Sequence, residues 1–198
     1  MKRETITNLK LLITIFLLIF LLIIVSGCIG GEKENSDVIE EVEIMQNISI
    51  SAEAFKYGDV IPSEYSCAGK DISPELSWTG IPAGTESIVL IMDDPDAPGG
   101  TFVHWVLFNI PATTQKLPIG VKKDKTLDDF SRQGKTDFGE VGYGGPCPPP
   151  GKYHRYYFRI YALDKMLELL PGASRSQIDS TSKGHILATG ELMGIYKR

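Results

Sequence analysis

Histidine is scarce in this chain, with 3 residues among 198, so the surroundings of each one are informative. His104 lies near the start of an aromatic and β-branched run, and His154 starts a similar run after a stretch rich in glycine and proline. Asp94 lies just before the first run, and a carboxylate can orient an imidazole and favour its cationic form. If both runs are strands that start at one end of a sandwich, these side chains could form a small cavity for a phosphate or carboxylate group.

The segment 138–151, which precedes the second run, holds too much glycine and proline for regular structure. Backbone N–H groups in such a loop can donate hydrogen bonds to an anion. The candidate donors are Gly142, Gly144 and Gly145, and the prolines from Pro146 onward would stiffen the loop. We therefore expect this loop to form one wall of the same cavity.

These residues also have a purely structural interpretation. Asp94 and Asp96 could simply cap a turn, as aspartate often does. His104, next to Trp105, could be a core histidine whose hydrogen bonds are satisfied. We expect His185, at the head of the last apolar run, to be structural. The sequence alone leaves both interpretations of Asp94 and His104 open.

Other kinds of chemistry have weaker support. No two histidines have the close spacing of a local metal site, so we expect neither a metal nor another cofactor. No Gly-x-Ser-x-Gly motif marks a nucleophile, so a hydrolase or isomerase with a pocket histidine as base is the least favoured alternative. Arg155 and Arg159 would share one face of a strand, solvated or ion-paired. Residues 44–198 hold 16 lysines and arginines against 18 aspartates and glutamates, which argues against nucleic acid as a partner.

Residues 1–27 are typical of a secretory signal peptide. Lys2, Arg3 and Lys10 are followed by 15 uncharged residues at 11–25, fewer than the roughly 20 that a spanning helix needs. The sequence VSGC at 25–28 resembles the lipobox of secreted lipoproteins, which implies cleavage before Cys28 and a lipid on its sulfur. The alternative is an uncleaved membrane anchor. Both predict a domain held at the extracytoplasmic face of the cell membrane.

An acidic stretch follows the signal segment. Residues 32–43 contain six acidic residues and one lysine. This composition is typical of a solvated, flexible tether, which we place at 28–46. The remaining residues, 47–198, form the predicted folded domain.

Two cysteines remain besides Cys28. Cys67 and Cys147 could form a disulfide in an oxidising location, or they could be separate thiols. A bond between them would close a long loop and add about 4 kcal/mol of stability on the chain-entropy model. The sequence cannot show whether the two residues lie close enough to bond.

Short apolar runs separated by turns dominate this domain, with no β-α-β alternation and no internal repeat. We expect strands at 44–55, 75–78, 87–92, 101–110, 153–163 and 184–196, and short helices at 164–170 and 174–183. Many strands with little helix predict an all-β fold of the sandwich type.

Three stretches together resemble the signatures of one known family. They are MDDPDAP at 92–98, HW at 104–105 with NIP at 109–111, and GYGGPCPP at 142–149 with HRY at 154–156. CAG at 67–69, SPELSW at 73–78 and GHILA at 184–188 also fit. Over about 49–198 the chain resembles the phosphatidylethanolamine-binding protein (PEBP) family, in its bacterial and archaeal branch of Raf-kinase-inhibitor-like proteins.

The resemblance implies an antiparallel Greek-key β-sandwich with small peripheral helices. It also implies a small pocket that binds phosphate-like head groups and other anions. The positions that match this pocket are Asp94, Phe102, His104, the loop 144–148, His154 and Tyr156. The short link from Asp96 to His104 and the lack of an extended C-terminal helix differ from animal members, and put their kinase-regulating role in doubt here.

We therefore expect a lipid-anchored, extracytoplasmic binding protein rather than an enzyme. Its partner would be an anionic small molecule or a phospholipid head group. The alternative from a different class is an inhibitor of a secreted protease, which would act through an exposed loop such as 113–137 instead of the pocket.

Overall fold

The computed structural model describes residues 46–198. The predicted signal peptide at 1–27, Cys28 and all but the last residue of the predicted tether at 28–46 lie outside the described residues. Within the described part, no helix has both the length and the apolar character needed to cross a membrane.

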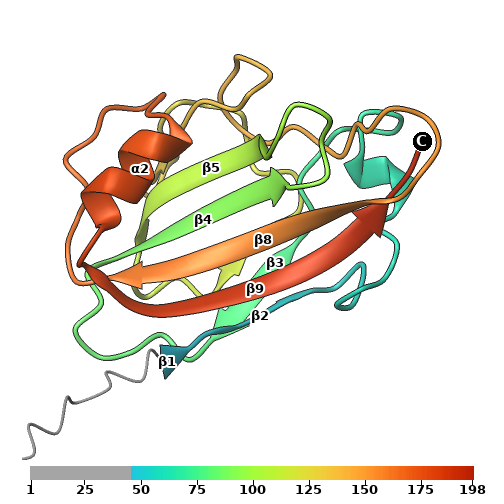
Figure 1. Cartoon of the computed structure of the whole chain (residues 1–198). Coiled ribbons are helices and arrows are strands. Elements are labelled where there is room, and N and C mark those ends of the chain that lie inside the picture. Colours follow the sequence, from blue (N-terminus) through green and yellow to red (C-terminus); the bar gives the residue numbers. More distant parts are fainter. Residues whose placement is uncertain (1–45) are drawn as a thin grey trace, which may run out of the picture. The chain divides into compact units, whose positions relative to one another are not determined.

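Two β-sheets form the described domain (Figure 1). The larger sheet has, in spatial order, β1 (Gln46–Asn47), β9 (Ile186–Tyr196), β8 (His154–Leu163), β4 (Ser87–Asp94), β5 (Phe102–Pro111) and β7 (Arg132–Gln133). The smaller sheet has β2 (Ser49–Ala52), β3 (Leu76–Thr79) and β6 (Lys116–Leu117). Neighbouring strands are antiparallel, except that β1 and β9 are parallel. The predicted all-β fold is confirmed.

Strand β4 lies at the centre of the larger sheet and is buried along its whole length. Leu90 and Met92 face the main core, to which residues of both sheets contribute. Val89 and Ile91 face a second apolar cluster that includes Ile178 of helix α2 (Arg175–Ser182). Because both faces of the strand are covered, its sequence is a continuous apolar run rather than an alternating one.

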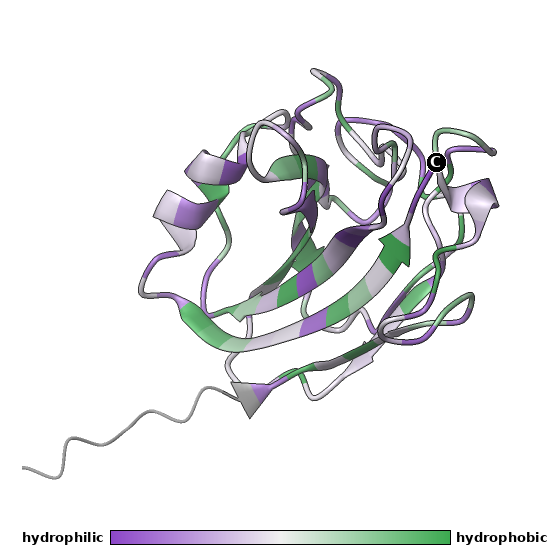
Figure 2. Cartoon of the chain, turned by 45° about the vertical axis from the view of Figure 1, so that its right-hand side comes forward, coloured by the Kyte–Doolittle hydropathy of each residue, from purple (hydrophilic) through white to green (hydrophobic). Residues whose placement is uncertain are grey.

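Strand β8 alternates between buried and more exposed residues, as its sequence predicts. Figure 2, which is coloured by hydropathy, shows hydrophilic and hydrophobic residues following one another along part of this strand. His154, Tyr156 and Phe158 point into the sandwich, whereas Arg155 and Tyr157 lie on the other face. The start of β8 therefore directs a histidine and a tyrosine toward the end of the core.

The two predicted helices have different outcomes. Helix α2 confirms the one at 174–183, and Ser174 and Gln177 form a capping box at its start. The helix predicted at 164–170 is wrong, because this segment has no regular structure. The side chain of Asn109 bonds both the N–H and the carbonyl of Leu167 (2.8 and 2.9 Å). These bonds tie the backbone to β5 and replace the contacts that a helical turn would make.

Candidate functional site

One end of the larger sheet gathers the predicted site residues. β4 ends there, β5 and β8 begin there, and β9 ends there (Figure 1). Asp94 is in register with Phe102, and His154 is in register with Tyr196. Antiparallel pairing thus brings together side chains that lie up to 62 positions apart in the sequence. We call Asp94, Phe102, His104, His154 and Tyr156 the histidine cluster.

His154 forms a buried pair with Asp94. Its Nδ1 atom lies 2.8 Å from Oδ2 of Asp94, and the two side chains are only 2% and 4% exposed. The other carboxylate oxygen accepts the N–H of Asp96 (2.8 Å). Asp94 therefore caps the turn and also orients the histidine, so that both interpretations of this residue hold at once.

His104 is fixed by the glycine loop. Its Nδ1 atom lies 2.8 Å from the carbonyl oxygen of Gly144, and its own carbonyl accepts the N–H of Gly144 (2.9 Å). A carbonyl can only accept, so Nδ1 must carry the proton and the neutral ring has its lone pair on Nε2. Burial lowers the pKa of His104 below its ordinary value, although Gly144 and the charge of Asp94 act in the opposite direction.

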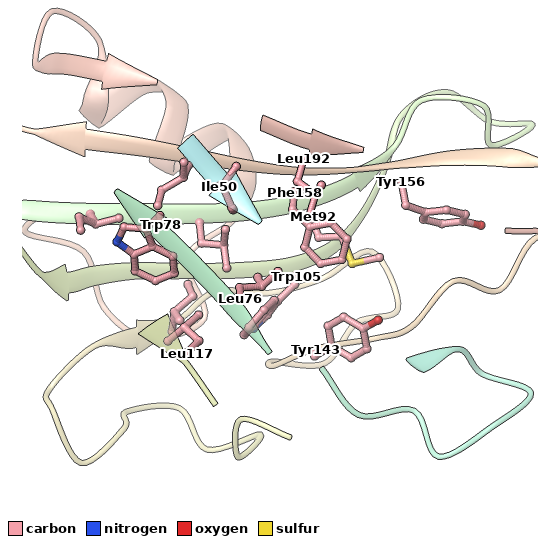
Figure 3. Close-up of a cluster of buried hydrophobic side chains, with 14 of the residues drawn as sticks. Ile50, Leu76, Trp78, Met92, Trp105, Leu117, Tyr143, Tyr156, Phe158 and Leu192 are labelled. Atoms are coloured by element: carbon pink, nitrogen blue, oxygen red, sulfur yellow. The ribbon is translucent and has the colours of Figure 1, made fainter. Parts of the chain in front are cut away.

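The hydroxyl of Tyr156 makes no hydrogen bond of standard length and angle. Among residues 46–198, it is the one buried side-chain nitrogen or oxygen atom that lacks such a bond. Figure 3 shows this ring at the end of the main core, with its hydroxyl pointing away from the other side chains. By contrast, the buried hydroxyls of Tyr143 and Tyr196 are both bonded (2.7 and 2.9 Å). Burial first, and then the charge and the side-chain contact of Asp94, raise the pKa of Tyr156 far above its ordinary value, although a backbone contact with Cys147 acts in the opposite direction. The group therefore keeps its proton and can donate.

The two ring Nε2 atoms lack protein partners as well. No hydrogen bond joins Nε2 of His104 or His154 to another described residue, yet neither atom is among the fully buried unpartnered ones. Their small exposed area therefore includes Nε2. Each histidine uses Nδ1 to hold its position and keeps Nε2 for the solvent side.

Aromatic rings enclose His104. Phe102, Phe138 and Tyr156 lie with their ring centroids 5.1, 5.2 and 5.2 Å from its imidazole. Phe138 is 47% exposed and was not among the predicted residues. The signal that could have found it is its place as an aromatic residue in the loop next to Gly144. A Cβ atom at Gly144 would lie 2.6 Å from the Phe138 ring, so glycine is needed for this packing.

Two amides of the glycine loop bind groups of the protein itself. The N–H of Gly144 bonds His104, and the N–H of Gly145 bonds the Asp71 carboxylate (2.7 Å). These two amides are thus occupied within the protein and are not free to donate to an anion in this structure. Gly144 contributes its carbonyl to the site instead.

A disulfide holds this loop in place. Cys67 and Cys147 are bonded, so the disulfide is present and the alternative of two separate thiols is excluded. The adjacent Pro146 accepts the N–H of Cys67 through its carbonyl (3.2 Å). The loop that carries Gly144 is therefore attached covalently to the segment before β3.

A cavity of about 310 Å³ lies beside the glycine loop, and none of the five residues of the histidine cluster lines it. Phe138, Gly144 and Gly145 line it on the side of the cluster, and Lys123 and Asp71 form an ion pair in it (2.8 Å). His104 contacts the lining of this cavity through the Phe138 ring and the Gly144 carbonyl.

The two arginines of β8 are ion-paired. Arg155 binds Asp96 through two side-chain hydrogen bonds (2.9 and 2.7 Å), which lower the pKa of Asp96. Arg159 pairs with the buried Asp93, which also binds Arg175 (2.8 Å). The positive charge of both β8 arginines is thus neutralised by carboxylates of the chain.

The third histidine lies elsewhere. His185 pairs with Asp164 (2.8 Å) just before β9 begins, whereas the cluster lies where β9 ends. Among the described residues, no three His, Cys, Asp or Glu side chains gather as a metal site would require.

A sequence model of the family described as "Phosphatidylethanolamine-binding protein" matches residues 51–197. A UPF0098 protein of Aquifex aeolicus is 50% identical over 153 residues, which cover 76% of this chain and 89% of that protein. A UPF0098 protein of Pyrococcus horikoshii is 42% identical over 181 residues, or 90% of this chain and 85% of that protein.

Two solved structures are similar. A putative PEBP homolog from Chlamydia trachomatis is 40% identical with a TM-score of 0.70, covering 77% of this chain and 98% of its own. YbcL of Escherichia coli, described as a new member of the mammalian PEBP family, is 33% identical with a TM-score of 0.72, covering 77% and 99%.

Proposed function

This chain belongs to the phosphatidylethanolamine-binding protein family, and from this premise we propose that its histidine cluster binds a phosphate group or a similar anionic head group. The family match and the structural neighbours support a binding protein of this family. The names of the similar proteins do not state an enzymatic activity, and we propose binding rather than catalysis.

The observation that carries this proposal is the unpartnered hydroxyl of Tyr156. A buried polar group without a partner costs about 1–3 kcal/mol. An anionic oxygen would accept this hydrogen bond, and Nε2 of His154 or His104 can add a second contact from the solvent side. Asp94 supports the arrangement because a proton gained by His154 would be compensated by its carboxylate.

We further propose that the domain is held at the extracytoplasmic face of the membrane by a lipid on Cys28. The lipobox-like sequence at 25–28 and the short apolar run before it support this location. The disulfide between Cys67 and Cys147 also agrees with an oxidising compartment. Metabolic labelling with a radioactive fatty acid tests it, with Cys28→Ala as the variant. Label that persists in this variant contradicts the proposal.

Calorimetric titration with phosphate and phosphoethanolamine tests the binding function. The full chain would be used, in a maltoside detergent that contains no phosphate. Tyr156→Phe removes the donor and should weaken binding about 10- to 100-fold, as expected for a hydrogen bond to a charged group. Tyr153→Phe is the matched control, because Tyr153 is 45% exposed. Equal weakening by both changes, or by neither, contradicts the proposed site.

Protease inhibition is a second candidate function, and one observation favours it. Phe130 lies in the predicted loop 113–137, is 80% exposed, and has a left-handed backbone (φ 67°). Such a conformation is rare for a bulky residue. The turn is closed by a bond from the N–H of Leu127 to the carbonyl of Ser131 (2.9 Å). Inhibition that survives His154→Ala but is lost in Phe130→Ala would favour this function.

A further inference from the structure

One peptide group connects His104 to the segment before β3. The carbonyl of Gly144 lies 2.8 Å from Nδ1 of His104. The N–H of Gly145 belongs to the same peptide group and bonds Oδ1 of Asp71 at 2.7 Å. The peptide is trans, so its C=O and N–H point in opposite directions. The Asp71 carboxylate, the peptide and the imidazole of His104 therefore form a continuous chain of hydrogen bonds.

The orientation of this peptide needs a partner outside the loop, because the residues on both sides of it are glycine. A peptide group between two residues without a Cβ atom can flip with little steric hindrance. Glycine is required at position 145, since a Cβ atom there would lie 2.3 Å from the carbonyl oxygen of Tyr65 and 2.9 Å from Oδ1 of Asp71. After a flip, an N–H would replace the carbonyl opposite Nδ1 of His104, and the histidine would lose its acceptor.

Other contacts attach the loop to the same segment without acting on this peptide. The hydroxyl of Tyr143 donates to the carbonyl of Tyr65 at 2.7 Å. After the two glycines, the Cys67–Cys147 disulfide attaches the loop again. Among the described residues, the hydrogen bond with Asp71 is the contact with this segment that fixes the plane of the peptide itself.

The charge of Asp71 suits it to this task. A carboxylate makes a stronger hydrogen bond with an N–H than a neutral acceptor does. It also polarises the peptide, so that the carbonyl on the other side becomes a better acceptor for His104. The second carboxylate oxygen pairs with Lys123, but the side chains of Asp71 and Lys123 are 38% and 44% exposed, so water screens this pair. The bond to the buried Gly145 is therefore the contact that matters.

Resting on the function proposed above, we infer that Asp71 is a positioning residue of the histidine cluster, which orients His104 through the Gly144–Gly145 peptide so that Nε2 faces a bound anion. Each histidine of the cluster then has a carboxylate behind its Nδ1 atom. Asp94 supports His154 directly, whereas Asp71 supports His104 through one peptide group. Asp71 acts through the histidine and needs no contact with the ligand.

Two substitutions separate the hydrogen bond from the backbone at this position, where φ is 55°. Asp71→Gly removes the acceptor, and glycine adopts a left-handed backbone without strain. Asp71→Asn keeps an oxygen that can accept from Gly145, and asparagine also tolerates a left-handed backbone. Lys123→Met is the matched control, because it breaks the exposed ion pair and leaves the bond to Gly145 in place.

Nitrogen-15 NMR of the His104 ring in the ligand-free chain at pH 8.0 tests the orientation. In the unmodified chain and in Asp71→Asn, Nδ1 should give the signal of a protonated ring nitrogen, and an unprotonated Nδ1 in the unmodified chain overturns the inference without any variant. In Asp71→Gly the signal should move toward that of an unprotonated nitrogen, because the peptide can flip. A role in stability alone would leave the ring signals of the folded protein unchanged. An unchanged signal in Asp71→Gly, or an equal change in Asp71→Asn, overturns the inference.

Calorimetric titration with phosphate measures the effect on binding, with the full chain in the phosphate-free maltoside detergent. Asp71→Gly should weaken binding on the order of tenfold, as loss of the outer partner of a ligating histidine does at metal sites. Lys123→Met should stay within about threefold of the unmodified chain, since an exposed ion pair contributes little. Equal weakening by these two changes overturns the inference but leaves the proposed function intact. If the unmodified chain does not bind phosphate, the proposed function fails, and the ring signals still decide whether Asp71 orients His104.

Discussion

The two ends of the larger sheet each carry a histidine–aspartate pair with the same spacing. Nδ1 lies 2.8 Å from the carboxylate in both His154–Asp94 and His185–Asp164. The first pair is 2% and 4% exposed, and the second is 40% and 45% exposed. β9 has 11 residues, so roughly 30 Å separates them. The contact is the same, and the surroundings decide what it can do.

Among the described residues, the buried pair differs from the exposed one in having further polar groups beside it that could bind a ligand. His104 and Tyr156 present an Nε2 atom and a hydroxyl that no described residue binds. A solvent-exposed ion pair is screened and contributes little. The comparison shows that a residue pattern such as His and Asp becomes a candidate site through burial and through unpartnered neighbours.

The largest expected effect is on stability, and it tests whether the two pairs differ. Asp94→Ala should lower the free energy of unfolding by about 3–5 kcal/mol, because it removes one partner of a buried pair. Asp164→Ala, the matched change at the other end, should cost about 0–1 kcal/mol. Urea denaturation of both variants measures the difference. Similar losses in the two variants would show that burial does not distinguish the pairs.

The disulfide provides the next effect. Cys67 and Cys147 are 80 positions apart, and replacing both by alanine should lower stability by about 4 kcal/mol on the chain-entropy model. The loop that carries Gly144 would also lose its attachment, so binding of phosphate should weaken more than a change at His185 weakens it. A stability measured in urea that does not change on replacement would contradict the expectation.

Tyr156→Phe should have a smaller effect with the opposite sign. Removing an unpartnered buried hydroxyl should raise the stability of the ligand-free protein by about 1 kcal/mol. The same change should weaken phosphate binding, so stability and function move in opposite directions. Thermal denaturation without ligand checks the first part, and a loss of stability would show that the hydroxyl has a partner within the protein.

The pH dependence of stability should be a small effect, because it comes from a single group. Burial lowers the pKa of His104 in the folded state, so between this value and about 6.5 the unfolded chain binds more protons. The contribution of His104 to the free energy of unfolding should be complete above pH 6.5. It should fall as the pH decreases below this value, by at most about 1.4 kcal/mol per pH unit. His104→Gln should reduce this slope in urea denaturation, and His185→Gln is the control. An unchanged slope in His104→Gln would assign it to other groups.

Much of the site could be predicted because it depends on strand ends. Apolar runs and turn residues place Asp94, His104 and His154 next to turns, and antiparallel pairing then brings those ends together. Phe102 and Tyr156 came from the family resemblance alone. Their role as an enclosing ring and a buried donor depends on packing, which the sequence does not display.

The features that the sequence did not reveal depend on which side chains or carbonyls the backbone groups bind. The amides of Gly144 and Gly145 were expected to face an anion, but His104 and Asp71 bind them. The segment 164–170 has helical composition, yet Asn109 binds its backbone at Leu167. In each case a side chain distant in sequence takes the bond, and local patterns cannot reveal such partners.

Titration of the full chain with phosphate, followed by the histidine ring signals in NMR, tests the central claim most directly. We predict saturable, pH-dependent shifts for His104 and His154, with His185 unmoved. Absence of any shift of His104 and His154 at millimolar phosphate would contradict the claim that the histidine cluster is an anion-binding site.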